Sequence, residues 1–103
     1  MSEETHASQR VDLWLCHARF FKTRTLASRV VANGRLRLTR SGQVRRLSKA
    51  SSTLTIGDEL TLPLNRKIVR IKVLALSERR GPASEAQMLY EHLDEGQSLG
   101  DES

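Results

Sequence analysis

The spacing of apolar residues changes along this chain from a helical period to a strand period, and this change limits the folds that the chain can adopt. Between residues 10 and 31, apolar side chains recur at the spacing of one helix face, near every third or fourth residue. After Gly34 they alternate with polar residues, which is typical of strands with one buried face. The sequence therefore predicts a small domain of the α+β class.

The first helix is predicted over residues 10–19. Its apolar stripe consists of Val11, Trp14, Leu15 and Ala18. Asp12 falls in the first turn, where the helix dipole favours an acidic side chain. We expect Asp12 to cap the helix or to pair with a nearby arginine.

A second helix is predicted after the interruption at residues 20–22. Thr23 is placed as its N-cap, and Asn33 with Gly34 should end it in a left-handed turn. Its inward face is expected to consist of Leu26, Ala27, Val30 and Val31. Ser28 and Arg29 should then project away from the core.

Strands are predicted where apolar and polar residues alternate. They cover residues 35–39, 59–62 and 67–76, and residues 53–56 lead into a turn at Gly57 and Asp58. In the first strand, Leu36 and Leu38 alternate with Arg35 and Arg37, so its outer face should be basic. Ser41 and Gly42 mark a turn, and the basic stretch over residues 44–49 is less regular.

The C-terminal part is expected to form a last helix. Gly81 and Pro82 break the preceding strand, and Ser84 with Gln87 has the spacing of a capping box. The stripe of this helix is Ala86, Leu89, Tyr90 and Leu93, and Gly96 should end it. We therefore divide the chain into a disordered arm (1–9), a folded domain (10–76), a loop with a packed helix (77–95) and a disordered acidic tail (96–103).

Positive charge is confined to the middle of the sequence. All 17 Lys and Arg residues lie between Arg10 and Arg80, a span with only four acids, which leaves a charge of about +13 within a net charge of +5. Charge held on a folded core, and not spread along a tail, favours a surface that meets phosphate. Any single cation could equally be part of a solvated face.

Other features argue against catalysis, metal binding and membrane insertion. Cys16 is the single cysteine and has no partner at metal-ligand spacing, which suits a reducing, cytoplasmic setting. His6, His17 and His92 are scattered, and no run approaches the length of a membrane span. We expect a non-enzymatic monomer without cofactor or metal. Trp14, Phe20 and Phe21 are expected to pack in the core or a loop, and not to stack on bases.

The ends of the two helices carry the candidate phosphate contacts. Arg10, Arg19, Lys22 and Arg24 surround them, near the backbone donors of a helix N-terminus at Thr23.

The order of short motifs resembles the S4-type RNA-binding domain. The motifs are Arg10-x-Asp12-x-x-Leu15, Ala18-Arg19, Thr23-Arg24-x-x-Ala27, a glycine that ends the second helix, a basic segment with Lys49 and Ser51, and Gly57-Asp58. The resemblance covers about residues 10–73. It implies a domain with two short helices packed on a small antiparallel β-sheet, here followed by the C-terminal helix.

Two further stretches are similar to the ribosome-associated heat shock protein 15 family. They are Trp14-Leu15 through Arg24 and Glu78 through Ala86 with Leu89-Tyr90-Glu91. The resemblance implies binding of structured ribosomal RNA on the large subunit, particularly on subunits that hold a nascent chain on transfer RNA after heat stress. It also implies RNA contacts, and with the basic strand face the candidate set is Arg10, Arg19, Lys22, Thr23, Arg24, Arg29, Arg35, Arg37 and Lys49. The family usually has an Asn-Gly hairpin turn, where this chain has Ser41-Gly42.

Two alternatives remain open at this point. S4-type domains often direct RNA-modifying enzymes, and because this chain has no room for a catalytic domain, such an enzyme would have to act in trans. The basic charge would also suit a DNA-binding protein. A comparison of affinity for structured RNA and duplex DNA separates these hypotheses.

Overall fold

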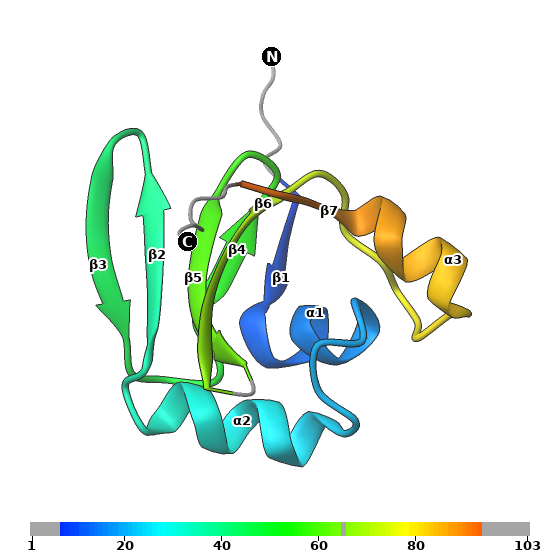
Figure 1. Ribbon diagram of the computed structural model, residues 1–103, viewed down its shortest axis with the longest axis horizontal. Coiled ribbons are helices and arrows are strands. Elements are labelled where there is room, and N and C mark those ends of the chain that lie inside the picture. Colours follow the sequence, from blue (N-terminus) through cyan, green and yellow to red (C-terminus); the bar gives the residue numbers. More distant parts are fainter. Residues whose placement is uncertain (1–6, 65, 94–103) are drawn as a thin grey trace.

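The computed structural model describes residues 7–64 and 66–93 (Figure 1). Its helices are α1 (Val11–His17), α2 (Arg24–Ala32), the short α3 (Ala83–Ala86) and the 3-10 turn η1 (Gln87–Leu89). Its strands are β1 (Ser8–Arg10), β2 (Leu36–Arg40), β3 (Gln43–Leu47), β4 (Thr53–Thr55), β5 (Glu59–Leu64), β6 (Lys67–Val73) and β7 (Tyr90–His92). The α+β prediction is confirmed.

Helix α1 forms the centre of the core. The whole predicted stripe is buried, with Val11, Trp14 and Leu15 at 0% exposure and Ala18 at 3%. The helix is shorter than predicted, because Arg10 belongs to β1 and the chain turns at Arg19, whose φ is 66°.

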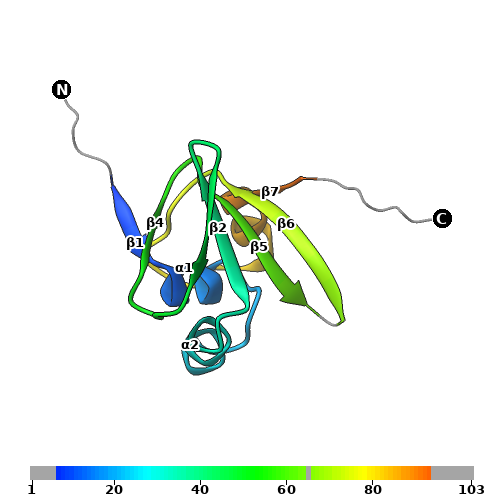
Figure 2. The same cartoon turned by 90° about the vertical axis from the view of Figure 1, so that its left-hand side faces the viewer.

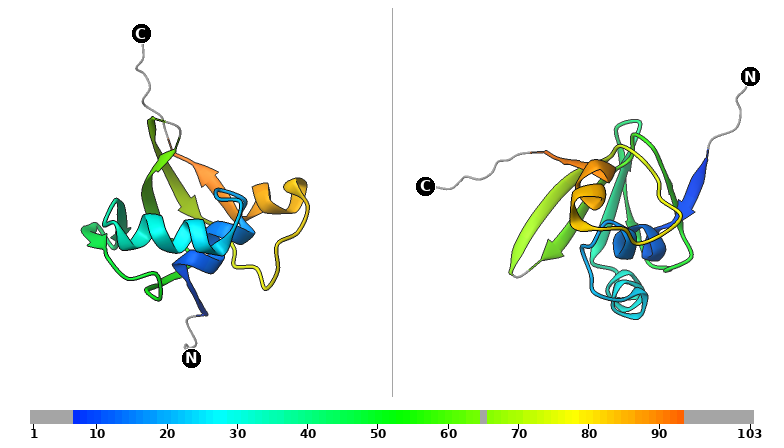
Figure 3. Two further views of the ribbon diagram at one scale, coloured as in Figure 1. Left: turned by 90° about the horizontal axis from the view of Figure 1, so that it is seen from below. Right: turned by 90° about the vertical axis from the view of Figure 1, so that its right-hand side faces the viewer.

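Helix α2 lies across α1 (Figure 3). Its predicted caps are confirmed, since Thr23 accepts a hydrogen bond from the Leu26 N–H and Gly34 has a φ of 74°. The predicted inward face is partly wrong. Leu26 is 40% exposed, whereas Ser28, expected to point outward, faces α1. The buried side of α2 is centred on Ala27 and Val31, and Leu26 lies well away from that side at 100° per residue.

Five antiparallel strands form the main sheet, in the order β3-β2-β5-β6-β7. β2 and β3 form a hairpin, so the irregular basic stretch is in fact a strand. The turn between them is Ser41-Gly42, and both residues have a positive φ (52° and 79°), as in the type I′ turns that suit the twist of hairpins. Figure 2 shows this hairpin rising beside β5 and β6.

The strand registers separate a buried face of the sheet from an outer one. The buried face carries Leu36, Leu38, Leu60, Leu62, Ile71 and Val73, each at 1% exposure or less. They pack with α1 and α2 in one hydrophobic core. The intervening residues of these strands form the outer face, which includes the basic side of β2 that the alternation predicts.

Part of the expected N-terminal arm is ordered, which corrects that prediction. Ser8 and Gln9 belong to β1, which pairs with β4 in a separate two-stranded sheet. The Val11 N–H then donates to the Ser52 carbonyl (2.8 Å). A disorder prediction based on composition misses this pairing because the partner strand is more than 40 residues away. Residues 1–6 and the expected tail, 96–103, lie outside the described residues.

The predicted C-terminal helix is wrong beyond its first turns. Helix α3 has four residues, its N-cap is Pro82 and not Ser84, and Tyr90 starts β7. β7 pairs with β6. One hydrogen bond flanks the pairing on each side, from the Leu74 N–H to the Leu89 carbonyl and from the Leu93 N–H to the Arg70 carbonyl. β6 otherwise has an unpaired edge, so strand pairing outweighs the helical spacing of the apolar residues.

Candidate RNA-binding surface

Asp12 lies at the centre of a polar cluster between the two long helices. It is charged but 0% exposed. Its carboxylate accepts two hydrogen bonds from Arg10, from Nε (3.1 Å) and from Nη2 (3.0 Å). It also accepts bonds from Ser28 Oγ (2.8 Å), Arg24 Nε (3.2 Å) and the Leu13 N–H (2.8 Å). The expected pairing of Asp12 with an arginine is confirmed, and it joins the start of α1 to α2.

The cluster holds two arginines in fixed positions. Burial by itself raises the pKa of Asp12, but the hydrogen bonds from Arg10, Ser28, Arg24 and Leu13 together outweigh burial and hold this pKa below its ordinary value. The carboxylate is therefore ionised at neutral pH. The side chains of Arg10 and Arg24 remain 41% and 48% exposed, and each guanidinium group has five N–H donors, more than Asp12 occupies.

The N-terminus of α2 lies beside this cluster. Thr23 Oγ1 satisfies the Leu26 N–H at 3.1 Å, and the first turn of α2 contains no acidic residue. Lys22 and Thr25 are exposed. The backbone N–H groups of a helix N-terminus carry partial positive charge, which adds to that of Lys22 and Arg24. Arg10, Lys22, Thr23 and Arg24 thus form one cationic surface, here called the α1–α2 surface.

Lys49 lies in the loop that covers the start of α1. Its carbonyl accepts the Ser52 N–H (2.9 Å), and Ser52 in turn accepts the Val11 N–H. Because Arg10 pairs with Thr53 in the small sheet, this loop runs next to the α1–α2 surface. The exposed side chain of Lys49 therefore extends from a loop beside Arg10.

Arg19 has a structural contact that the sequence did not indicate. Its Nε donates to the Gly81 carbonyl (2.8 Å), and nearby the Nε of Arg80 donates to the Cys16 carbonyl (3.2 Å). Two arginines therefore hold the C-terminal segment against the end of α1. Arg19 reaches a ligand only through the part of its exposed side chain that is not bound to Gly81.

The remaining candidates lie apart from the start of α2. Arg29 is on the exposed side of α2. Arg35 and Arg37 line depressions between the C-terminal end of α2 and the outer face of the sheet. Three cations that the sequence reading omitted lie there too: Arg46, Arg66 and Lys67. Alternation continued from Val44 through a second strand would have placed Arg46 on the outer face.

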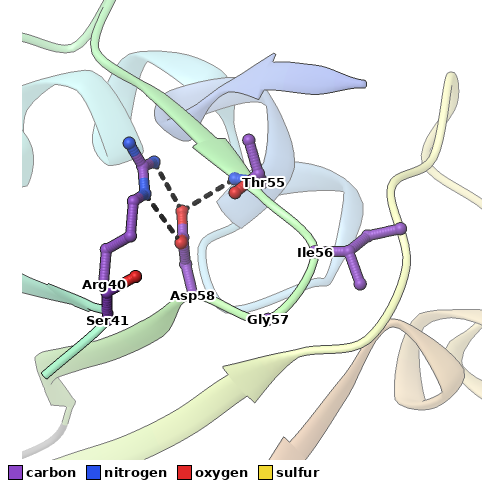
Figure 4. Close-up of a pocket in the computed structure, with 6 residues that line it drawn as sticks. All are labelled: Arg40, Ser41, Thr55, Ile56, Gly57 and Asp58. Atoms are coloured by element: carbon purple, nitrogen blue, oxygen red, sulfur yellow. Dashed lines mark hydrogen bonds and ion pairs between the residues drawn. The ribbon is translucent and has the colours of Figure 1, made fainter. Parts of the chain in front are cut away.

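A second buried carboxylate supports the hairpin and not the α1–α2 surface. Asp58 is 2% exposed and accepts Arg40 Nε (2.9 Å), Arg40 Nη2 (2.7 Å) and the Thr55 N–H (2.8 Å), as Figure 4 shows. Burial by itself raises the pKa of Asp58, but the hydrogen bonds from Arg40 and Thr55 outweigh burial. The pKa of Asp58 therefore lies below its ordinary value. Ile56, in the same turn, is 58% exposed. The ion pair fixes the β2–β3 hairpin to the turn before β5.

Several side chains that could carry chemistry are engaged within the fold. They contain no group of three or more His, Cys, Asp or Glu side chains that could hold a metal ion. His17 lies half-buried with Nδ1 2.7 Å from the Ser77 carbonyl, so this nitrogen is engaged within the protein. Trp14 Nε1 donates to the Ala75 carbonyl (2.9 Å), which agrees with a packing role for this indole. No helix among the described residues is long and apolar enough to cross a membrane.

Comparison with known proteins identifies relatives over most of the chain. The chain is 38% identical to heat shock protein 15 of Escherichia coli K12 over 95 residues, which are 92% of this chain and 68% of the relative. It is 35% identical to the RQC P-site tRNA stabilizing factor of Bacillus subtilis over 92 residues, which are 89% of this chain and 99% of that protein. No family model matches the sequence.

A solved structure supports the same relationship. The trimeric structure of Vibrio cholerae heat shock protein 15 superimposes with a TM-score of 0.74 at 36% identity, covering 84% of this chain and 83% of that one. Sequence and fold therefore agree on the relatives.

Proposed function

The chain belongs to the heat shock protein 15 family, and from this we propose that it is a non-catalytic, cytoplasmic RNA-binding protein that acts on the large ribosomal subunit. The observation that carries the proposal is the α1–α2 surface, in which buried Asp12 holds two half-exposed arginines beside the N-terminus of α2. Such a fixed array of donors suits the phosphates of RNA in a defined shape.

The names of the relatives support the choice of ligand. One relative is named for a P-site tRNA, and heat shock protein 15 is named for the heat-shock response. We infer that this chain binds large subunits on which a tRNA is still held, and that heat stress increases the need for it. The RNA contacts would be Arg10, Lys22, Thr23 and Arg24, with Lys49, Arg29 and the outer part of Arg19 at the edges.

Lys22→Ala tests the α1–α2 surface. The side chain is exposed, so we expect an intact fold and RNA binding weakened about two- to fivefold, as for one exposed ion pair. The slope of log affinity against log salt concentration should fall by about 0.7–0.9. The measurement is fluorescence anisotropy with a structured fragment of large-subunit RNA at several salt concentrations.

Lys72→Ala is the matched control, because Lys72 lies on the outer sheet face between Glu59 and Glu91. The two variants remove the same charge at different places. An unchanged slope for Lys22→Ala would exclude this residue from the site, and tighter binding to duplex DNA than to RNA would contradict the function. In a sucrose gradient of cell extract, absence from all ribosomal fractions with and without heat stress would contradict the ribosomal role.

The expected monomer stays a prediction, because the solved relative is described as trimeric. Light scattering of the purified chain at micromolar concentration gives the mass directly. A mass that stays at the monomer value as the protein concentration is raised would agree with the prediction.

A further inference from the structure

Cations are concentrated at one end of the outer sheet face. The register places Arg37 directly opposite Arg46 in the β2–β3 hairpin, and opposite Thr61 of β5 on its other side. Both arginines are exposed. Like charges that face each other across an antiparallel pair destabilise it, so this arrangement has a cost in the unbound protein.

These arginines border a depression that contains an exposed apolar side chain. A cavity of about 310 Å³ is lined by Arg35, Arg37, Arg46, Thr61, Pro63 and Ile68, among others. Ile68 is 77% exposed and lies opposite Pro63 in the register. An adjoining cavity of about 480 Å³ shares Arg35, Pro63 and Ile68 and adds Arg66 and Lys67. We call the two together the Ile68 groove.

The positive charge is specific to this end of the face. No described residue that lines either cavity is acidic. At the other end of the same face, Arg70 pairs with Glu59 (3.1 Å), and Lys72 lies between Glu59 and Glu91. The outer face is therefore charge-balanced near β7 and cationic around Ile68. A ligand for the groove must bring both anions and an apolar surface.

We propose that the Ile68 groove binds a short unpaired segment of RNA. One base would pack on Ile68 and Pro63, and the neighbouring phosphates would lie between Arg37 and Arg46 and near Arg35. Unpaired nucleotides offer both chemistries at once, since bases bury an apolar surface while phosphates meet cations. A phosphate between Arg37 and Arg46 would also relieve their repulsion.

The position of the groove favours RNA over an acidic peptide. Val30 of α2 and Asn33, which caps the C-terminal end of α2, line the adjoining cavity, so the groove begins where α2 ends. The other end of α2 carries the α1–α2 surface. The helix has nine residues, a length of about 13 Å at 1.5 Å per residue, which one RNA molecule can span. This inference rests on the proposed function to the extent that one RNA would reach both places.

The test uses fluorescein-labelled decauridylate, an RNA without stable base pairing, and two variants of the full chain. Ile68→Ser should weaken binding on the order of fivefold without changing the salt slope, because it removes only apolar contact. The double variant Arg37→Ala/Arg46→Ala should lower the slope by about 1.4, the value for two phosphates of a single strand. Lys72→Ala, on the same face, should reduce the affinity and the salt slope much less than the groove variants do. Ile68, Arg37 and Arg46 are all exposed, and circular dichroism melting checks that the variants fold.

Three results would overturn the proposal. The first is unchanged decauridylate binding in both groove variants. The second is equal loss on Lys72→Ala, which would mean a general charge effect. The third is a decaglutamate peptide that binds as tightly as decauridylate and is weakened equally by Ile68→Ser, which would assign the groove to an acidic peptide. Failure of the proposed function is distinguishable, because it appears as unchanged binding of structured RNA by Lys22→Ala, whatever the groove variants do.

Discussion

At the scale of single residues, Asp12 has the greatest influence on the candidate site. Its carboxylate is fully buried and accepts hydrogen bonds from both Arg10 and Arg24, which the sequence predicts only as separate phosphate contacts. The two arginines are therefore positioned by an acid that is itself shielded from solvent. A residue-by-residue list of cations does not reveal this dependence.

Asp12→Asn should lower the free energy of unfolding by about 1–3 kcal/mol at neutral pH, because charge-assisted hydrogen bonds to a buried group are lost. Urea denaturation measures the loss. The pKa of Asp12 is lowered in the folded protein, so its stabilising contribution is present above the ordinary carboxylate pKa and is lost as the pH falls through the folded pKa. The difference between wild type and variant should therefore shrink below about pH 4.

Glu78→Gln is a control for this prediction, because Glu78 is exposed and should change stability by less than about 0.5 kcal/mol at neutral pH. The stability of the Asp12→Asn variant should still fall in acid, since Asp58 also has a lowered pKa. A wild-type minus Asp12→Asn difference that stays constant between pH 7 and pH 2 would contradict the role assigned to the Asp12 charge.

At the scale of elements, local signals predicted the ends of α2 and the hairpin turn better than they predicted pairing. Thr23 and Gly34 act at the ends of α2 as expected. β1 and β7, in contrast, form only because β4 and β6 offer strand edges far away in the sequence. The apolar residues Leu89 and Tyr90 fit a helical stripe, yet Tyr90 pairs with Val73, and its ring packs 4.5 Å from that of Phe20 between centroids.

Ser41→Asn should stabilise the β2–β3 hairpin. Ser41 has a φ of 52°, in the left-handed region that asparagine tolerates better than serine, and Asn-Gly is the favoured pair for type I′ turns. We expect the free energy of unfolding to rise by about 0.5–1 kcal/mol. Thermal melting measures it, and Gly42→Ala, at a φ of 79°, should act in the opposite direction. A lower melting temperature for Ser41→Asn would mean that the turn does not have this geometry in solution.

At the scale of the whole molecule, cations gather where acids are few, and this has opposite consequences for folding and for binding. The Arg37–Arg46 pair and the cations around Ile68 repel one another. The ion pairs of Asp12 and Asp58 involve buried acids, and salt screens them less than pairs between exposed charges. Salt should therefore affect the repulsion more than these attractions.

Raising the salt concentration from about 0.05 to 0.2 M should raise the melting temperature slightly while weakening RNA binding by an order of magnitude or more if several phosphates are bound. Calorimetric melting and anisotropy in the same buffers measure both. In the double variant Arg37→Ala/Arg46→Ala, the gain in melting temperature with salt should be smaller. A melting temperature that falls with salt in the wild type would mean that screened attractions outweigh the repulsion.

Residues that are close in sequence were enough to predict the class of the fold, the buried faces of α1 and β2, the caps of α2 and the basic character of the middle of the chain, because each depends on local spacing. Other features follow only from the tertiary structure. Ser8 and Gln9 pair with β4, Tyr90 belongs to a strand, and Leu26 is exposed. Asp12 binds both Arg10 and Arg24, and Arg37 lies opposite Arg46. Each of these depends on which distant strand edge or buried charge needs a partner, and that need exists only once the chain is folded.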